Sequence, residues 1–269
     1  MRAVAIALAL LLCALPAQAL ELQGEIAQGG LVVGRVAPGS TVSLDGRDVP
    51  VAADGHFAFG FPYNAEPTAE LVVRDGAGAV ERRTLSVARR QFQIQRIDGL
   101  PPAMVTPPPE VLERIKRENE RINAARKVVS PVAHFAAGWR WPAIGPITGV
   151  FGSQRILNGE PRSVHYGVDV AAPKGTPIVA AAAGTVTLAG DLYFSGNTVF
   201  IDHGVGVNSS YLHMDSITVQ EGEAVQAGQQ IGALGATGRA TGPHLHWGLN
   251  WFAVRLDPAL VAPPMPERQ

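Results

Sequence analysis

The sequence predicts a mostly β protein with two domains, joined by a proline-rich linker and one helix. Short runs of alternating apolar and polar residues recur along the chain, and Pro-Gly and Asp-Gly pairs punctuate them. Helical periodicity is clear only in one charged stretch near the middle. The chain has 269 residues, which is enough for two ordinary domains.

The first 19 residues have the pattern of a secretory signal. Arg2 supplies the positive charge, residues 4–15 form an almost unbroken apolar run, and Ala17-Gln-Ala19 is an A-x-A cleavage site. The run is short for a membrane span, and no charged stop-transfer flank follows it. We therefore expect secretion across the inner membrane, cleavage after Ala19 and no stable membrane insertion. An uncleaved anchor is the alternative.

Cysteine and charge exclude several classes of protein. The only cysteine, Cys13, lies inside the predicted signal, and Leu12 stands where a lipoprotein signal has a small residue. The mature chain would therefore contain no disulfide and would depend on its apolar core, which the 46% apolar composition can support. Losing Arg2 makes the mature charge balance 21 − 23 = −2. The sequence contains no block of basic residues of the kind that would predict a nucleic-acid partner.

Residues 20–97 are predicted to form a small β-sandwich-like domain. Alternation is visible over residues 41–44 and 57–61. Turn signals follow at short intervals, at residues 38–39, 45–46, 54–55 and 75–76, which is typical of sandwiches. A structural or spacer role is favoured over binding of a glycan or a protein. His56 lies beside a turn and is expected at the surface.

Residues 98–138 are predicted to be a linker. Five prolines between residues 100 and 109 keep that part extended and stiff. Glu110 to about Val128 then forms a charged helix with Val111, Ile115 and Ile122 in one narrow stripe. Such a stripe usually rests on a neighbouring domain, and a regulatory helix that covers a cleft is the alternative. His134, which follows, has no partner by spacing.

Residues 139–260 are predicted to form an antiparallel β-sheet domain or flattened barrel, followed by a tail over residues 261–269. Glycine-containing turns separate strands that are expected at residues 177–181, 184–188, 197–202, 209–214 and 230–234.

Five of the seven histidines lie between residues 165 and 246. They fall in three patches, with His203 apart from all three: His165-x-x-x-Asp169, Tyr211-x-His213 and His244-x-His246. His and Asp are ligands that suit Zn²⁺, and three protein ligands with an open position distinguish a catalytic zinc from a structural one. A histidine in any one of these patches alone would more often have a structural role than bind a metal ion. Three patches in one domain predict a zinc site.

The spacings within these patches fit the geometry of a β-strand. Side chains two apart in a strand point the same way, so His244 and His246 share a face. His165 and Asp169, four apart, share a face in a strand and nearly so in a helix, and Gly167 permits a close backbone approach or a bend. Two histidines beyond three ligands could accept a proton from water or stabilise an oxyanion. His203 fits no patch and is expected to have a turn or supporting role.

Residues from Trp141 to about Pro258 resemble the M23 family of zinc metallopeptidases, also called LytM or lysostaphin-type peptidases. The resemblance covers about half of the mature chain. The motifs that carry it are Phe151-Gly152, His165-x-x-x-Asp169, Ala172-Pro-x-Gly-Thr-Pro177, Tyr211-x-His213 and Gly242-Pro-His-Leu-His246.

The resemblance implies the site and the activity. It makes His165, Asp169 and His246 the ligands of one Zn²⁺ per chain, and His213 and His244 the catalytic pair. It implies a duplicated hybrid-motif fold and an endopeptidase of the periplasm or cell envelope. The substrates implied are peptidoglycan stem peptides or cross-bridges. Neither the bond cut nor the oligomeric state follows from it.

Two other functions compete with this one. Some relatives have lost ligands and only activate a cell wall amidase, but all five positions are filled here. A carrier-like hybrid module would present a lysine at a hairpin tip, and residues 222–232 contain none. The enzyme is therefore the favoured prediction, with the non-catalytic LytM-type regulator as the alternative.

Overall fold

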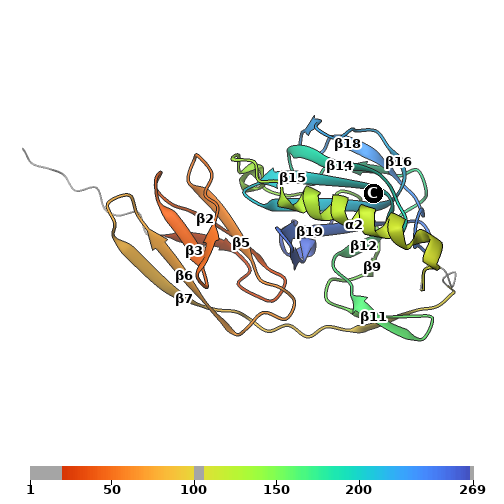
Figure 1. The fold of residues 1–269 in the computed structure, drawn as a ribbon, viewed down its shortest axis with the longest axis horizontal. Helices are drawn as coiled ribbons and strands as arrows, with labels where there is room; N and C mark the ends of the chain where they lie inside the picture. Colours follow the sequence, from red (N-terminus) through yellow and green to blue (C-terminus); the bar gives the residue numbers. More distant parts are fainter. Residues whose placement is uncertain (1–19, 100–105, 267–269) are drawn as a thin grey trace, which may run out of the picture.

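A computed structural model describes residues 20–99 and 106–266, with two β domains side by side and one α-helix along the C-terminal domain (Figure 1). The predicted signal, residues 1–19, lies outside the described residues, as do part of the linker and the end of the tail. Within the described ranges, no helix is long and apolar enough to cross a membrane. The prediction of a mostly β protein with antiparallel sheets is confirmed.

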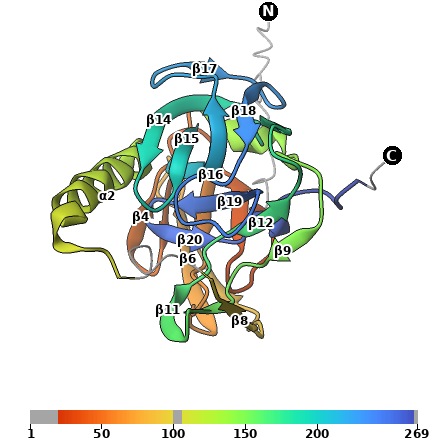
Figure 2. The ribbon, with the colours of Figure 1, turned by 90° about the vertical axis from the view of Figure 1, so that its right-hand side faces the viewer.

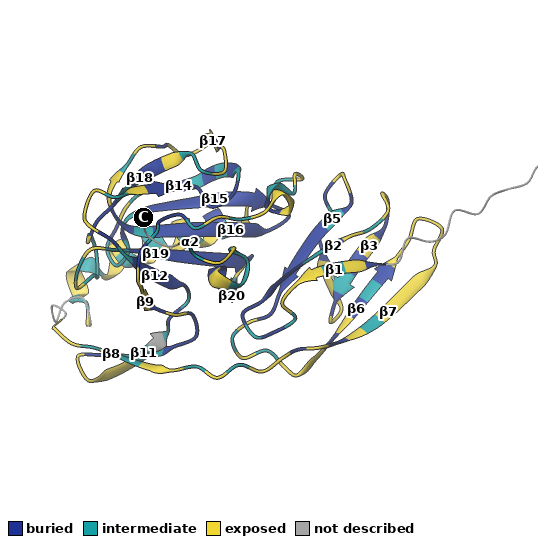
Figure 3. Cartoon of the chain, turned by 180° about the vertical axis from the view of Figure 1, so that it is seen from behind, coloured by how far each residue is buried: buried dark blue, intermediate teal, exposed yellow. Residues whose placement is uncertain are grey.

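The N-terminal domain consists of two packed antiparallel sheets. One has the strand order β1-β2-β5 and the other β4-β3-β6-β7. Their bounds are β1 Glu21–Gly24, β2 Leu31–Arg35, β3 Thr41–Leu44, β4 Arg47–Val49, β5 His56–Gly60, β6 Thr68–Arg74 and β7 Val80–Ser86. Alternation along β6 buries Ala69, Leu71 and Val73 between the sheets, while β7 is largely exposed (Figure 3).

The last strand of residues 20–97 does not pair within the N-terminal domain. Strand β8, Ile94–Ile97, pairs in parallel with β10, Gln154–Leu157, and β10 pairs antiparallel with β11, Glu160–Val164. These strands form a small separate sheet beside the C-terminal domain (Figure 2). The segment that leaves the N-terminal domain is thereby attached to a hairpin of the C-terminal domain.

The linker helix α2 runs over Leu112–Lys127, after a 3-10 turn, η1, at Pro109–Val111. It begins slightly later than expected, because residues 109–111 form that tighter turn. Its inward stripe packs on β14 and β15, with Ala125 buried beside Phe200 and Ile122 next to them. Two exposed arginines form ion pairs with the C-terminal domain, Arg114 with Asp191 and Arg121 with Glu221. A second 3-10 turn, η2, covers His134–Ala137.

The C-terminal domain is built on a ten-stranded antiparallel sheet with the main order β17-β14-β15-β16-β19-β12-β9. Strand β13 pairs with β18, β18 also pairs with β16, and β20 pairs with β19. The bounds are β9 Ile147–Gly149, β12 Val168–Ala171, β13 Pro177–Val179, β14 Gly184–Leu192, β15 Gly196–Gly204, β16 Val207–Ile217, β17 Ala224–Val225, β18 Gln230–Leu234, β19 His244–Trp251 and β20 Val254–Leu256, followed by a 3-10 turn, η3, at Pro258–Leu260. Each expected strand overlaps an observed one.

The two domains share a continuous apolar core. The N-terminal cluster around Phe57 and Phe59 includes Leu249, Trp251 and Leu256 of the C-terminal sheet, all fully or almost fully buried. A second cluster lies inside the C-terminal domain, around Tyr211 and Trp247. Because β19 contributes to both clusters, the strand that carries His244 and His246 is held from both domains.

Candidate metal centre

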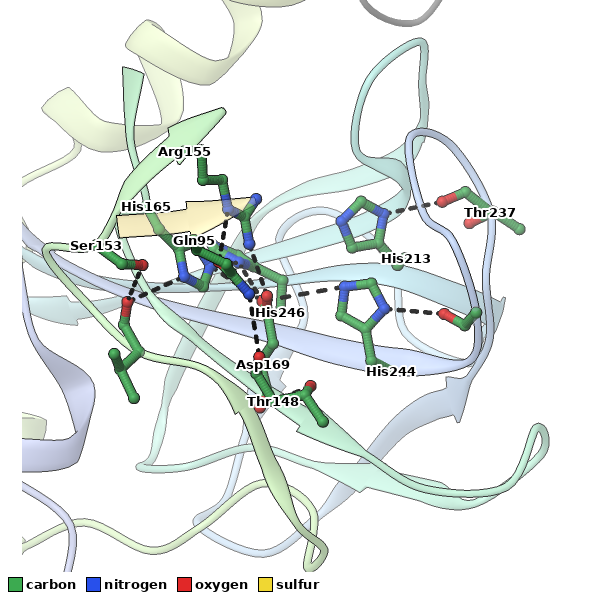
Figure 4. Close-up of polar contacts among 12 residues, drawn as sticks. Gln95, Thr148, Ser153, Arg155, His165, Asp169, His213, Thr237, His244 and His246 are labelled. Atoms are coloured by element: carbon green, nitrogen blue, oxygen red, sulfur yellow. Dashed lines mark hydrogen bonds and ion pairs between the residues drawn. The ribbon is translucent and has the colours of Figure 1, made fainter. Parts of the chain in front are cut away.

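Three side chains converge where β12 meets β19. In the antiparallel register Asp169 lies opposite His246, and His165 lies just before β12. The Asp169 Oδ1 atom is 2.9 Å from His246 Nδ1 and 3.0 Å from His165 Nε2, and these two nitrogens are 2.9 Å apart (Figure 4). Two imidazole lone pairs and a carboxylate oxygen at this separation repel each other unless a cation or protons lie between them.

The three atoms fit a tetrahedral zinc ion. Donors about 2.0–2.1 Å from such an ion lie about 3.3 Å apart, close to the observed separations of 2.9–3.0 Å. The His165 Nδ1–H donates to the Val150 carbonyl over 3.2 Å, which leaves Nε2 with its lone pair toward the other two donors. Two nitrogens and one oxygen form a ligand set typical of catalytic zinc.

The protonation states also suit a metal. Burial raises the pKa of Asp169, but the close contacts of its carboxylate with the His165 and His246 rings together outweigh burial and hold the pKa well below its usual value. Burial lowers the pKa of His246 to about 4. The carboxyl group is therefore ionised and the His246 imidazole neutral at physiological pH, which are the forms that bind metal ions.

His213 reaches the site through an irregularity in β16. The strand pairs with β19 up to Leu212 and with β18 from Met214, and its register with β15 shifts at the same place. His213 has φ 63° there, in the left-handed region that residues other than glycine rarely adopt. Its Nδ1–H donates to the Thr237 carbonyl over 2.9 Å, so Nε2 carries the free lone pair.

His244 lies on the same face of β19 as His246, as strand alternation predicts. Its Nδ1–H donates to the Gly242 carbonyl over 2.9 Å, and its Nε2 is 3.9 Å from Asp169 Oδ1. The His213 and His244 ring centroids are 4.8 Å apart. Each ring has Nδ1 fixed by a backbone carbonyl, so two Nε2 atoms remain for chemistry beside the three converging donors (Figure 4).

Two glycines permit the close packing of the centre. A Cβ at Gly167 would lie 2.6 Å from His246 Nε2 and 2.6 Å from the Trp247 carbonyl oxygen, and a Cβ at Gly149 would collide with Asp169. Sequence reasoning identified the close approach at Gly167 but not the one at Gly149.

Arg155 is a further site residue that sequence reasoning missed. It lies on β10, and its Nη2 donates to Asp169 Oδ2 over 2.6 Å. No local spacing in the sequence signals this contact, because it depends on how the β10–β11 hairpin folds over β12.

The other histidines lie outside this cluster. His203 is fully buried, with Nδ1 2.6 Å from the Ala183 carbonyl and Nε2 2.7 Å from the Ser209 hydroxyl. Its ring packs edge-on against Trp139, with a centroid distance of 4.9 Å. It therefore supports the core rather than a turn. His56 binds Asp54 near the surface, and His134 begins η2.

Comparison with known proteins identifies related chains. The sequence profile of Peptidase family M23 matches residues 163–258. DD-carboxypeptidase/endopeptidase Mpg of Neisseria meningitidis is 43% identical over 104 residues, which are 39% of this chain and 24% of that protein. Peptidoglycan DD-endopeptidase ShyC of Vibrio cholerae is 44% identical over 100 residues, 37% of this chain and 23% of that protein. The chain thus spans about a quarter of the length of these curated relatives.

A solved structure covers nearly the whole chain. A Pseudomonas aeruginosa protein assigned to peptidase M23 superposes with a TM-score of 0.69 and 34% sequence identity. The match covers 88% of this chain and 95% of that one, so it includes both domains.

Proposed function

The chain belongs to peptidase family M23, and from this premise we propose that it is a zinc-dependent endopeptidase that hydrolyses peptide cross-links of bacterial peptidoglycan. The observation that supports the proposal most strongly is the convergence of three donor atoms, all within 2.9–3.0 Å of one another, beside two imidazoles with free Nε2 atoms. The relatives' names, which include peptidoglycan DD-endopeptidase, support a D,D cross-link as the bond that is cut.

In this proposal His165, Asp169 and His246 hold one Zn²⁺. The ion supplies a Lewis acid that polarises the scissile carbonyl and lowers the pKa of water. Arg155 holds the second oxygen of Asp169 and the Val150 carbonyl holds the far nitrogen of His165, so both ligands are fixed in orientation. No cysteine or fourth protein ligand occurs among the residues that converge there, which leaves a position for substrate.

His213 and His244 move protons and stabilise charge in the proposed mechanism. Each presents an Nε2 lone pair, because its Nδ1–H is held by a backbone carbonyl. Burial, with His244 and His246 nearby, lowers the pKa of His213 to about 3, so that imidazole is neutral before reaction. One ring accepts at its Nε2 the proton that the attacking water loses and passes it to the leaving amine nitrogen. The other ring, where it already carries an Nε2 proton when substrate binds, donates that N–H to the oxyanion of the tetrahedral intermediate.

The proposed location is the periplasm or cell envelope. It depends on the predicted signal at residues 1–19 and on a substrate that lies outside the cytoplasm.

The test is digestion of purified sacculi by the purified full chain, followed by analysis of the released muropeptides. We expect cross-linked dimers to fall and monomers to rise. A metal chelator should stop the reaction and added Zn²⁺ should restore it. Activity that persists after complete removal of metal would refute the zinc mechanism.

A second arm tests the regulator. A cell wall amidase is assayed on the same sacculi with and without the protein. Sacculi left uncut by the protein alone, together with stimulated amidase activity, would replace the enzyme proposal with the non-catalytic LytM-type regulator.

A further inference from the structure

A cavity of about 250 Å³ adjoins the metal centre, and its wall is strongly cationic. His165, His213 and His246 form part of its lining. The lining includes no aspartate or glutamate but five arginines from distant parts of the chain: Arg126 of α2, Arg155 of β10, Arg162 of β11, Arg239 of the loop before β19 and Arg255 of β20. We call this cavity the arginine pocket.

Three of these arginines have no acidic partner in the described parts of the chain. Within residues 20–99 and 106–266, no ion pair involves Arg126, Arg162 or Arg255, and the Nε atoms of Arg126 and Arg162 are buried without a hydrogen-bond partner there. The Arg126 guanidinium lies 5.3 Å from the Phe200 ring centre, and that of Arg255 lies 5.6 Å from the Tyr166 ring centre. Aromatic faces therefore position Arg126 and Arg255, while the Asn250 amide oxygen accepts from Arg255 and the Thr106 hydroxyl from Arg162. Among the described residues, no acid neutralises these three charges.

The exposed arginines of helix α2 can be compared with Arg126 of the same helix. Two of its exposed arginines, Arg114 and Arg121, are each paired with an acid of the C-terminal domain, Asp191 of β14 and Glu221 of the turn after β16. The inward Arg126 is more buried and yet has none. The C-terminal domain supplies acids to two exposed arginines that face it, where pairing contributes little, and none to the more buried Arg126, which helix docking alone does not explain.

The clustered arginine charges are unfavourable in the free protein. Burial lowers the pKa of Arg126 to about 9, and the charge of Arg255 adds to the lowering. Burial also lowers the pKa of Arg255 to about 10. Burial, Arg155 and Arg162 together lower the pKa of Arg239. Arginine stays protonated under such conditions, so these groups remain charged and an anion between them would relieve the repulsion.

We propose that the arginine pocket binds free carboxylates of the peptide substrate and thereby selects acidic stem peptides over amidated ones. Guanidinium groups match the planar carboxylate with two parallel hydrogen bonds, and desolvation strengthens each bond. The pocket opens on the imidazoles of the metal centre, so a bound carboxylate belongs to a residue near the scissile bond. This inference rests on the proposed peptidase function, because that function supplies the peptide.

The test compares two versions of one substrate. A cross-linked muropeptide dimer is used with its carboxylates free, and again after their conversion to carboxamides. The ratio of kcat/KM for the two is measured on the zinc-loaded full chain. We expect a preference of about 10- to 100-fold for the acidic dimer, in keeping with charge-assisted hydrogen bonds. In Arg126→Gln and in Arg255→Gln this ratio should fall at least about fivefold, since each removes one guanidinium.

Arg121→Gln is the matched control, because it removes an arginine from the same helix outside the pocket. Its ratio should stay within about twofold of the original, as expected for an exposed pair. A ratio near one in the unchanged protein, or a ratio preserved in both pocket variants, would overturn the inference while leaving the peptidase proposal intact.

If neither dimer is cleaved, that result counts against the proposed function. A direct binding measurement then tests whether the arginine pocket prefers the carboxylate. Calorimetry on the His244→Ala background should show that the amidated dimer binds more weakly than the acidic dimer. It should also show that either pocket variant binds the acidic dimer more weakly than the unchanged pocket does. Equal binding of both dimers would again overturn the inference. Melting temperature provides a check on a purely structural role. We expect Arg126→Gln to melt at an equal or higher temperature, whereas a lower melting temperature with an unchanged substrate ratio would contradict the proposal.

Discussion

Substitution of Gly167 by alanine tests how tightly the fold holds the proposed metal ligands. The backbone at this glycine is not in the left-handed region, so alanine is acceptable there and the effect comes from its neighbours. The new Cβ would lie 2.6 Å from His246 Nε2 and 2.6 Å from the Trp247 carbonyl oxygen. Ordinary contacts of these kinds are about 3.4 Å, so roughly 0.8 Å must be recovered by movement.

The movement must come from His246 or from the pairing of β12 with β19. Metal–ligand distances tolerate only about 0.2 Å, so the shift is several times larger than the site can absorb. We expect zinc affinity to fall about 10- to 100-fold, or about 1.4–2.7 kcal/mol. Turnover of zinc-saturated enzyme should fall on the order of 100-fold, because a displacement of about 1 Å has that effect.

The assay is competition for Zn²⁺ against a coloured chelator, combined with muropeptide release at saturating zinc. Gly190→Ala is the matched control, because it lies in β14 of the same sheet and its Cβ would find the nearest side chain at an ordinary 3.6 Å. Circular dichroism melts would show that both variants fold. Zinc affinity and turnover of Gly167→Ala equal to those of Gly190→Ala would refute the geometric reasoning.

Three further outcomes are expected. His246→Ala should lose both zinc and activity, whereas His244→Ala should keep zinc and lose about 10²- to 10⁴-fold in turnover; equal zinc loss, measured by metal analysis, would overturn these roles. His203 should add a pH dependence to stability, because burial lowers its pKa to about 4 in the fold against about 6.5 when unfolded. The stability that neutral His203 contributes is then full above pH 6.5 and falls by about 2 kcal/mol at pH 5. The difference in urea-unfolding free energy between the unchanged protein and His203→Asn should therefore shrink on acidification, and a difference that stays constant with pH would disprove this reasoning. Leu249→Ala should cost about 2–5 kcal/mol and lower the unfolding midpoint of both domains together, since Leu249 lies in their shared core; separate shifts would contradict that coupling.

Local patterns in the sequence predicted much of the fold. Alternation and turn pairs predicted both β domains, because a half-buried strand imposes a period of two on its side chains. The linker helix was predicted from its stripe, and only its first residues differ, where Pro109 begins a 3-10 turn. Strand β8 was assigned to the N-terminal domain by position in the chain. Its pairing with β10 is a long-range choice that no local pattern encodes.

The candidate site divides in the same way. The residue types and spacings of His165, Asp169, His244 and His246 can be read from the sequence, and two-residue alternation sets the common face of His244 and His246 in β19. His165 lies before β12 rather than in it, so strand alternation does not place it beside Asp169. The sequence does not say which nitrogen faces the centre. The Val150 carbonyl decides this for His165, and the Thr237 carbonyl decides it for His213.

The sequence by itself predicted a zinc-type ligand set, two further imidazoles beside it and a β framework to hold them. Tertiary structure alone decided that three donor atoms meet within 3.0 Å, that His203 is a core residue, and that arginines from four separate elements and a loop gather in one cavity. The physical reason is that spacing along a strand is fixed by covalent geometry, whereas contacts between distant segments depend on register and packing of the whole chain.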